Sequence, residues 1–181
     1  KSFKQIREVL ITKLVIDSRA VTDPEGSLFF ALTGKRDGHK YIADAYANGI
    51  RSFVISDPQY IQQYSDANIL LVGDVLLALQ KLAKYNRDQY DLKVIGITGS
   101  NGKTIVKEWL YQLLAADFNI IRSPKSFNSQ IGVPLSVWEM DEHHTLGVFE
   151  AGISKGNEMD ALEEIIKPNI GILTNLGEAH A

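Results

Sequence analysis

Two kinds of hydrophobic pattern alternate along the first half of the chain. Short runs rich in β-branched and aromatic residues predict strands, and apolar residues three and four positions apart predict helices. Asp74 is a typical N-cap for the second helix, and Gly49 is a typical stop for the first. The predicted strands cover residues 14–16, 28–32, 51–56 and 68–72, and the predicted helices cover residues 40–48 and 74–88.

After Asp91 strands and helices follow one another in regular order, which predicts a parallel sheet with helices packed on it. Two of the strands, at 145–149 and 170–174, are apolar enough to be buried on both faces. The expected strands are 93–98, 118–122, 145–149 and 170–174, and the expected helices are 104–116, 132–139 and 158–166. In the helix over 104–116 the residues expected to face inward are Val106, Trp109, Leu110, Leu113 and Leu114.

The composition excludes several classes of protein. Hydrophobic residues make up 45% of the 181 residues, which excludes disorder of the whole chain. The absence of cysteine excludes a disulfide framework, a thiolate zinc site and a cysteine nucleophile. A net charge of −3 argues against a general nucleic-acid partner, and no apolar run approaches the ~20 residues that a membrane span needs.

The most informative motif is a glycine-rich loop between a predicted strand and a predicted helix. Residues 94–104 read Val-Ile-Gly-Ile-Thr-Gly-Ser-Asn-Gly-Lys-Thr. Glycines let backbone N–H groups converge on an anion, and the helix N-terminus adds partial positive charge. In such a loop the Lys103 side chain is suited to contact the phosphates, and the Thr104 hydroxyl is suited to bind Mg²⁺. The loop is a short variant, since Ile97 stands where the common phosphate loop has its first glycine. A plain glycine turn with a surface lysine is the alternative.

The segment Thr98–Thr104 resembles the ATP loop of the Mur ligases, which form amide bonds in peptidoglycan precursors. Residues 126–134, 149–154 and 168–180 are similar to three further segments of that family. In the N-terminal half, Asp17-Ser18-Arg19, residues 26–34 and Asp37-Gly38-His39 resemble the branch that adds D-alanyl-D-alanine. The resemblance covers nearly the whole chain.

This resemblance implies the fold and the reaction. The fold class is α/β: a small N-terminal domain that binds a UDP-muramyl peptide, over residues 1–88, precedes the first part of a P-loop parallel-sheet ATPase domain, over 89–181. The implied enzyme uses ATP and Mg²⁺ to join D-alanyl-D-alanine to a UDP-N-acetylmuramoyl-tripeptide through an acyl phosphate. It is expected to be cytoplasmic and monomeric, with no nucleic-acid or membrane partner. The family's carbamylated lysine and C-terminal domain are expected downstream of this chain.

Several residues of the second half are candidates for the ATP site. Glu150 ends a predicted parallel strand, where a carboxylate suits Mg²⁺, and a helix-capping surface acid is its alternative. The Asn128 side chain is suited to orient phosphate or metal-bound water. The alternative is that Asn128 is an ordinary turn residue. His180 taken alone is a loop histidine, and only the resemblance makes it an active-site residue near the metal. The resemblance also implies nucleotide contacts from Thr98, Gly99, Ser100, Asn101, Gly102, Lys103 and Thr104. It implies catalytic roles for Lys103, Glu150, His180 and Asn128, and metal contacts from Thr104, Glu150 and His180.

The N-terminal half carries the candidates for substrate binding. Arg19 can make a bidentate contact with phosphate or carboxylate, and a surface salt bridge to Asp17 or Asp23 is its alternative. The resemblance favours binding of the UDP-linked substrate. The full candidate set is Ser18, Arg19, Thr33, Gly34, Asp37, Gly38 and His39.

Other functions stay open on the sequence alone. A related ligase that adds another amino acid, or a folate-polyglutamylating ligase, shares the ATP loop. A small-molecule kinase uses such a loop without activating a carboxylate. A binding module without turnover is a further alternative.

Overall fold

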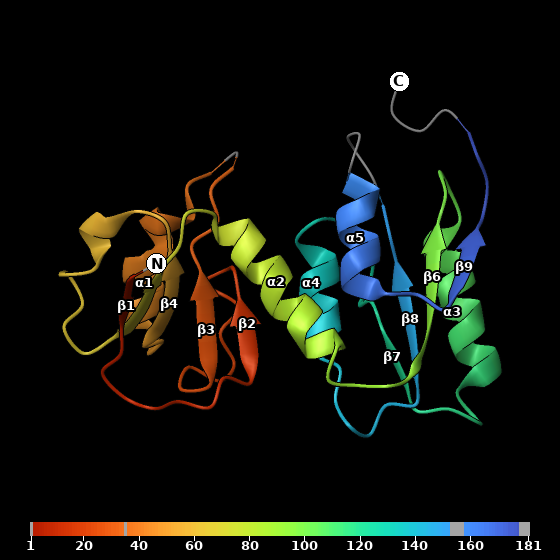
Figure 1. The fold of residues 1–181 in the computed structure, drawn as a ribbon, viewed down its shortest axis with the longest axis horizontal. Coiled ribbons are helices and arrows are strands. Elements are labelled where there is room, and N and C mark those ends of the chain that lie inside the picture. Colours follow the sequence, from red (N-terminus) through yellow and green to blue (C-terminus); the bar gives the residue numbers. More distant parts are fainter. Residues whose placement is uncertain (1, 35, 153–157, 178–181) are drawn as a thin grey trace. The chain divides into compact units, whose positions relative to one another are not determined.

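The computed structural model describes residues 2–34, 36–152 and 158–177. The chain divides into two compact units, Lys1–Leu79 and Gln80–Ala181, each built on its own sheet (Figure 1). The division falls inside α2 (Val75–Arg87). A functional boundary at residue 88 therefore stays a prediction.

The first unit contains a five-stranded sheet in the order β1-β5-β4-β3-β2. Neighbouring strands from β2 to β5 are parallel, and β1 is antiparallel to β5. The sequence did not predict β1, because three residues with one apolar side chain show no periodicity. The strands are β1 (Ser2–Lys4), β2 (Lys13–Val15), β3 (Ser27–Phe30), β4 (Ser52–Ile55) and β5 (Asn68–Leu71), with short helices η1 (Gly38–Tyr41), α1 (Ile42–Ala47) and η2 (Pro58–Tyr60).

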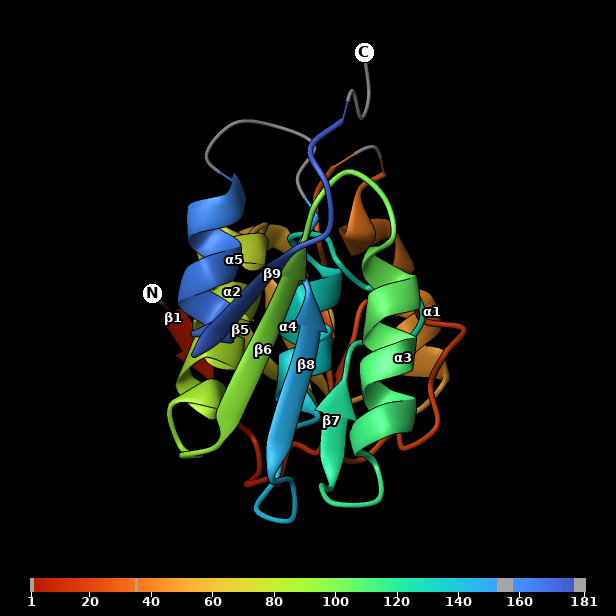
Figure 2. The same ribbon diagram turned by 90° about the vertical axis from the view of Figure 1, so that its right-hand side faces the viewer.

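The second unit contains a four-stranded parallel sheet in the order β7-β8-β6-β9 (Figure 2). Because Val94 and Ile95 point to opposite faces of β6, they belong to different cores. Val94 packs in the core with α4 and α5, and Ile95 packs in the core with α3. The elements are β6 (Lys93–Thr98), α3 (Lys103–Leu114), β7 (Ile120–Arg122), α4 (Gly132–Trp138), β8 (Leu146–Glu150), α5 (Glu158–Ile166) and β9 (Ile170–Leu173).

Two expectations about burial are wrong. Val106, Leu110 and Leu114 of α3 do pack on the sheet, but Trp109 is 63% exposed and Leu113 is 74% exposed. The apolar residues of this helix form two adjacent stripes, and only one of them meets the sheet.

The second error concerns β9. All five residues of β8 are buried, as expected, whereas the side chains at the two ends of β9 are each more than half exposed. In the described part of the chain β9 pairs only with β6 and forms an edge of the sheet. A strand at an edge has one neighbour, so its apolar sequence does not ensure burial.

The helices of the described ranges all fall short of the length and apolar character that a membrane span requires.

Candidate functional site

The glycine-rich loop follows β6 and leads into α3. Gly99 has a φ of +130° and Gly102 a φ of +84°, a region that favours glycine. A Cβ atom on Gly99 would also lie 2.2 Å from the Thr174 hydroxyl oxygen. Both the backbone conformation and the space at Gly99 therefore require glycine.

The loop is bound to the segment that follows β9. Ser100 N–H donates to the Asn175 carbonyl oxygen at 3.1 Å, and Asn101 N–H donates to Asn175 Oδ1 at 2.9 Å. Thr174 Oγ1 donates to the Asn101 carbonyl oxygen at 2.5 Å. Because these two loop N–H groups already have acceptors, the donors best placed for an anion are the N–H groups of the first turn of α3, which lack intrahelical acceptors.

Lys103 begins α3 and reaches back over the loop. Its Nζ donates to the Gly99 carbonyl oxygen at 2.6 Å. The ammonium group is thus held beside the helix N-terminus, where an anion would meet both positive charges. This arrangement agrees with a phosphate-binding loop and gives Lys103 a defined position in it.

Thr104 and Glu150 meet at the carboxyl edge of the sheet. Thr104 Oγ1 donates to Glu150 Oε2 at 3.0 Å, and Ser126 Oγ lies 3.5 Å from Thr104 Oγ1. Glu150 is the last residue of β8 and has no exposed surface. Full burial rules out the alternative of a surface acid that caps a helix.

The sequence analysis missed Lys107, which lies one helical turn after Lys103. Its side chain is fully buried, and its Nζ lies 2.8 Å from Glu150 Oε1. The same Nζ donates to the carbonyl oxygens of Ser123, at 2.8 Å, and Lys125. The spacing of four residues after Lys103, on one side of the helix, is the only sequence signal that could have singled it out.

Asn128 lies against the chain just beyond Glu150. Gly152 N–H donates to the Asn128 carbonyl oxygen at 2.8 Å, and a Cβ on Gly152 would come within 3.0 Å of the Asn128 side chain. The structure thus brings Asn128 to the edge that carries Thr104 and Glu150. His180 lies outside the described residues.

The residues at this edge fit a magnesium ion. A hydroxyl and a carboxylate oxygen lie together there, and hard oxygen donors are what Mg²⁺ prefers. Glu150 Oε1 is buried and has no partner with hydrogen-bond geometry, since its contact with Lys107 is an ion pair. Within the described ranges no group of three or more His, Asp or Glu side chains could hold a metal. Because Mg²⁺ is usually bound through one or two carboxylates, with waters and phosphates, such a group is not required.

The first unit has a pocket of about 360 Å³ at the carboxyl ends of β2 and β3, the edge at which open α/β sheets bind ligands. It brings together three of the predicted substrate residues, Ser18, Arg19 and Gly38, with a second arginine, Arg36. Its lining consists of Ile16, Asp17, Ser18, Arg19, Leu32, Arg36, Gly38, Tyr41 and Asp44.

Arg19 forms a salt bridge with Asp17 in this pocket. Arg19 Nε lies 2.9 Å from Asp17 Oδ1, and Nη2 lies 2.7 Å from Oδ2. These side-chain hydrogen bonds, with one from the Arg19 backbone N–H, lower the pKa of Asp17 from 3.8 to about 2. The salt bridge left open by the sequence is therefore formed, and the contact of Arg19 with substrate stays a prediction.

His39, Asp37, Thr33 and Gly34 do not line this pocket. His39 is 3% exposed, and its Nε2 accepts the Ser56 N–H at 3.0 Å. Its proton is thus on Nδ1, which donates to Asp37 Oδ1 at 2.7 Å and lowers the pKa of that carboxyl. The backbones of Thr33 and Asp37 pair as a single antiparallel β-bridge outside the sheet. These residues shape the loop around Gly38, where a Cβ would lie 2.6 Å from the Leu32 carbonyl oxygen.

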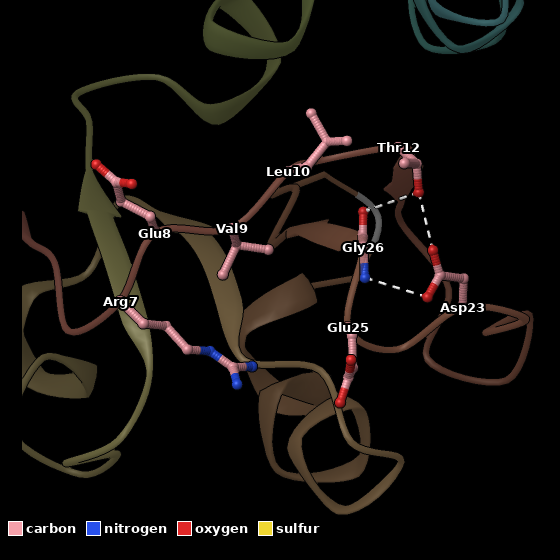
Figure 3. A pocket seen from close by; sticks show the side chains of 8 residues that line it. All are labelled: Arg7, Glu8, Val9, Leu10, Thr12, Asp23, Glu25 and Gly26. Atoms are coloured by element: carbon pink, nitrogen blue, oxygen red, sulfur yellow. Dashed lines mark hydrogen bonds between the residues drawn. The ribbon is translucent and has the colours of Figure 1, made fainter.

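A second pocket of about 390 Å³ lies at the opposite edge of that sheet, where β2 and β3 begin (Figure 3). Its acid Asp23 accepts hydrogen bonds from Thr12 Oγ1 at 2.9 Å and Gly26 N–H at 3.2 Å. These bonds lower the pKa of Asp23 and close the turn before β3. Because the Asp23 carboxylate is already hydrogen-bonded within the turn, this pocket is a weaker candidate for substrate binding than the pocket at Arg19.

Two models of known protein families match this chain. Residues 10–87 match the model of the Mur ligase family catalytic domain, and residues 97–181 match that of the Mur ligase middle domain. The two matched regions together cover most of the chain.

Curated relatives and solved structures give the same result. The UDP-N-acetylmuramoyl-tripeptide–D-alanyl-D-alanine ligase of Bacillus subtilis is 34% identical over 97% of this chain, and that of Rickettsia prowazekii is 39% identical over 86%. The chain spans 38% and 34% of the lengths of these two proteins. The crystal structure of MurF from Acinetobacter baumannii matches 97% of the chain and 38% of its own length, with a TM-score of 0.88 and 34% identity. MurF ligase from Thermotoga maritima in complex with ADP matches 96% of the chain and 40% of its own length, with a TM-score of 0.82 and 31% identity.

Proposed function

The chain belongs to the Mur ligase family, and we propose that it forms part of an ATP-dependent ligase that adds D-alanyl-D-alanine to a UDP-N-acetylmuramoyl-tripeptide. Relatives with that name align with nearly the whole chain at 30–39% identity, which supports this branch over other members of the family. The similarity extends through both units, so it is not limited to the shared ATP loop.

One observation carries the proposal. The Thr104 hydroxyl and the buried Glu150 carboxylate lie 3.0 Å apart, beside a glycine loop and a helix N-terminus that holds Lys103. Oxygen ligands for a cation and positive groups for phosphates are thereby placed at one edge of a parallel sheet. The Thermotoga MurF, solved with ADP, supports ATP as the nucleotide of this site.

The proposed chemistry assigns each of these residues a task. Lys103 and the first N–H groups of α3 bind the phosphates of ATP and hold the γ-phosphoryl group for attack. Thr104 and Glu150 hold Mg²⁺, which offsets negative charge on the phosphate oxygens. Asn128 orients phosphate or a metal-bound water. For His180 the resemblance to the family alone suggests a role near the metal.

The reaction then runs in two steps. A carboxylate oxygen of the tripeptide attacks the γ-phosphorus, ADP leaves, and an acyl phosphate forms. The amine of D-alanyl-D-alanine attacks the acyl carbon, phosphate leaves, and an amide bond forms. The contribution of the protein is mainly positioning and charge stabilisation.

The first unit is proposed to bind the UDP-linked substrate in the pocket at Arg19. Two arginines line it, Arg19 and Arg36, and guanidinium groups are well suited to a diphosphate. Ser18 adds polar groups from the loop after β2. The absence of cysteine agrees with a reducing compartment, and we propose that the enzyme acts in the cytoplasm. We further propose that it is a monomer.

A substrate panel tests the proposal. The full-length protein is incubated with ATP, Mg²⁺ and UDP-N-acetylmuramoyl-tripeptide, and with D-alanyl-D-alanine or with single amino acids in its place. Amide product by mass spectrometry and released phosphate should both appear with D-alanyl-D-alanine. With hydroxylamine in place of the amine, the acyl phosphate should be trapped as a hydroxamate. Amide formed only with a single amino acid would indicate another ligase, and a stable phosphorylated product without amide would indicate a kinase.

A further inference from the structure

Lys107 is a charged side chain with no exposed surface and no role in the chemistry described above. Lysine is almost never fully buried unless it is paired, because removal of an ammonium group from water is unfavourable. Among the ion pairs of the described residues, Lys107 and Glu150 form the one in which both side chains are fully buried. Its Nζ and Oε1 atoms are 2.8 Å apart.

The ammonium group of Lys107 is surrounded by oxygen atoms of the protein. An ammonium group has three N–H bonds. Nζ of Lys107 faces three close acceptors: the Ser123 carbonyl oxygen at 2.8 Å, the Lys125 carbonyl oxygen, and Glu150 Oε1 at 2.8 Å. Glu108 Oε1 lies farther away, at 3.4 Å. Two N–H bonds of Lys107 are thus taken by carbonyl oxygens, and its charge faces the Glu150 carboxylate in a site with no exposed surface. Lys107 is therefore not placed to contact a phosphate, and it differs in this from the partly exposed Lys103.

The same contacts fix the orientation of Glu150. Oε1 faces Lys107, and Oε2 accepts the Thr104 hydroxyl at 3.0 Å. Glu150 N–H donates to Ser123 Oγ at 3.2 Å, so the backbone of this residue is held by the same segment that Lys107 binds. The two carboxylate oxygens therefore have separate tasks, and only Oε2 points to the edge where Thr104 lies.

Lys107 also holds the segment after β7. Lys125 has a φ of +50°, an unfavourable backbone conformation for a residue with a side chain. Its carbonyl oxygen accepts a hydrogen bond from Lys107 Nζ. Ser126, the next residue, places its hydroxyl 3.5 Å from Thr104 Oγ1. One ammonium group thus links α3, this segment and the end of β8.

Stability alone gives little reason for such a pair. Replacement of a buried ion pair by apolar residues of similar size is often neutral or stabilising. Here the pair includes a candidate metal ligand, Glu150, which gives it a functional reason. A carboxylate that is held at one oxygen presents its other oxygen in a fixed direction.

We propose that Lys107 is a positioning residue: it holds Oε1 of Glu150 so that Oε2, with Thr104, is oriented to bind the divalent cation that accompanies the nucleotide. This inference rests on the proposed function, since it assumes a cation–nucleotide complex at this edge. It assigns Lys107 no contact with the nucleotide and no proton transfer.

The test measures binding of Mn²⁺ with ADP to the full-length protein by electron paramagnetic resonance. We expect Lys107→Met to weaken Mn²⁺ binding by about tenfold or more, a size seen when groups behind metal ligands are removed. Arg122→Met is the matched control, because Arg122, at the end of β7, forms an ion pair with Glu108 of α3 at 3.0 Å. In this variant Mn²⁺ binding should stay within about twofold of wild type. In turnover, Lys107→Met should raise the Mg²⁺ concentration for half-maximal rate and leave KM for D-alanyl-D-alanine unchanged.

A double variant covers the case in which Lys107→Met does not fold, since that change leaves a buried carboxylate unpaired. Glu150→Gln weakens Mn²⁺ binding, and Lys107→Met added to Glu150→Gln should weaken it no further, because no carboxylate remains to position. Additional weakening in the double variant, or wild-type Mn²⁺ affinity in a folded Lys107→Met, would overturn the inference. Mn²⁺–ADP binding without amide formation by wild type would contradict the proposed function alone, whereas no binding by wild type would overturn both.

Discussion

The side chain of Arg19, which we propose contacts the substrate, is held by Asp17 in the structure. The guanidinium group lies against the Asp17 carboxylate with two contacts of 2.7 and 2.9 Å, yet 85% of its side chain is exposed. An exposed ion pair contributes little to stability, so a phosphate can displace the carboxylate at small cost. Arg19 is thus both ordered and available.

The ion pair predicts a measurable titration. With Arg19 present, the pKa of Asp17 is about 2, because the arginine hydrogen bonds favour the charged carboxylate. We expect Arg19→Ala to raise this pKa toward the ordinary value of 3.8, as measured by NMR of labelled aspartate carboxyl carbons. Because the folded pKa is depressed, the small stabilisation is present above pH 3.8 and is lost as the pH falls toward 2. Arg36→Ala, in the same pocket, is the control. An unchanged pKa in Arg19→Ala would contradict the pairing.

The sequence indicated the residues that meet at the proposed nucleotide site better than the residues that hold them in place. Lys103, Thr104 and Glu150 follow from a loop between a strand and a helix and from the end of a parallel strand. Lys107 and Asn175 do not, because a second lysine on a helix is typical of a solvated surface and a loop asparagine is typical of a turn. Their partners come from other elements, so only the fold shows their importance.

Tertiary contacts decide which side of α3 faces the sheet. Its apolar residues lie in two stripes. One contains Val106, Leu110 and Leu114, and the other contains Ile105, Trp109 and Leu113. The first stripe packs against the core that includes β6 and β8. The second is exposed in the described structure. Helical periodicity identified the element but not which stripe meets the sheet.

This orientation predicts unequal effects for two identical substitutions. Leu110→Ala removes packing from the core of the sheet and should lower the free energy of unfolding by about 1–3 kcal/mol. Leu113→Ala, at a residue 74% exposed, should change it by less than about 0.5 kcal/mol. Urea unfolding of both variants and wild type provides the comparison. A larger loss for Leu113→Ala would mean that the other stripe of α3 is the buried one.

For most elements the sequence was enough to predict whether the element is a helix or a strand and roughly which residues it covers. The strand predicted over 93–98 and the helix predicted over 158–166 have those bounds in the structure, since each combines a strong pattern with clear ends. The burial of β9 was not predictable, because it depends on whether a second neighbour pairs with the strand. Strand β1 is too short to show a pattern.

At the scale of the molecule, the two units carry separate parts of the proposed reaction. The pocket at Arg19 belongs to the first unit, and the loop with Lys103, Thr104 and Glu150 belongs to the second. A family model matches each region. The alternation of strands and helices predicted two α/β regions, but the identity of the substrate came from resemblance, because periodicity holds no information about a ligand.

Amide formation by the Lys103→Ala variant of the full-length protein is the most direct test of the account. The assay follows ATP-dependent joining of D-alanyl-D-alanine to UDP-N-acetylmuramoyl-tripeptide, with Lys81→Ala as a matched control at an exposed lysine. Loss of the phosphate contact should slow the reaction on the order of 10²-fold or more, while Lys81→Ala retains the wild-type rate and both variants keep the wild-type circular dichroism spectrum. Near-normal amide formation by Lys103→Ala would contradict the assignment of residues 98–104 as the phosphate-binding loop of this ligase.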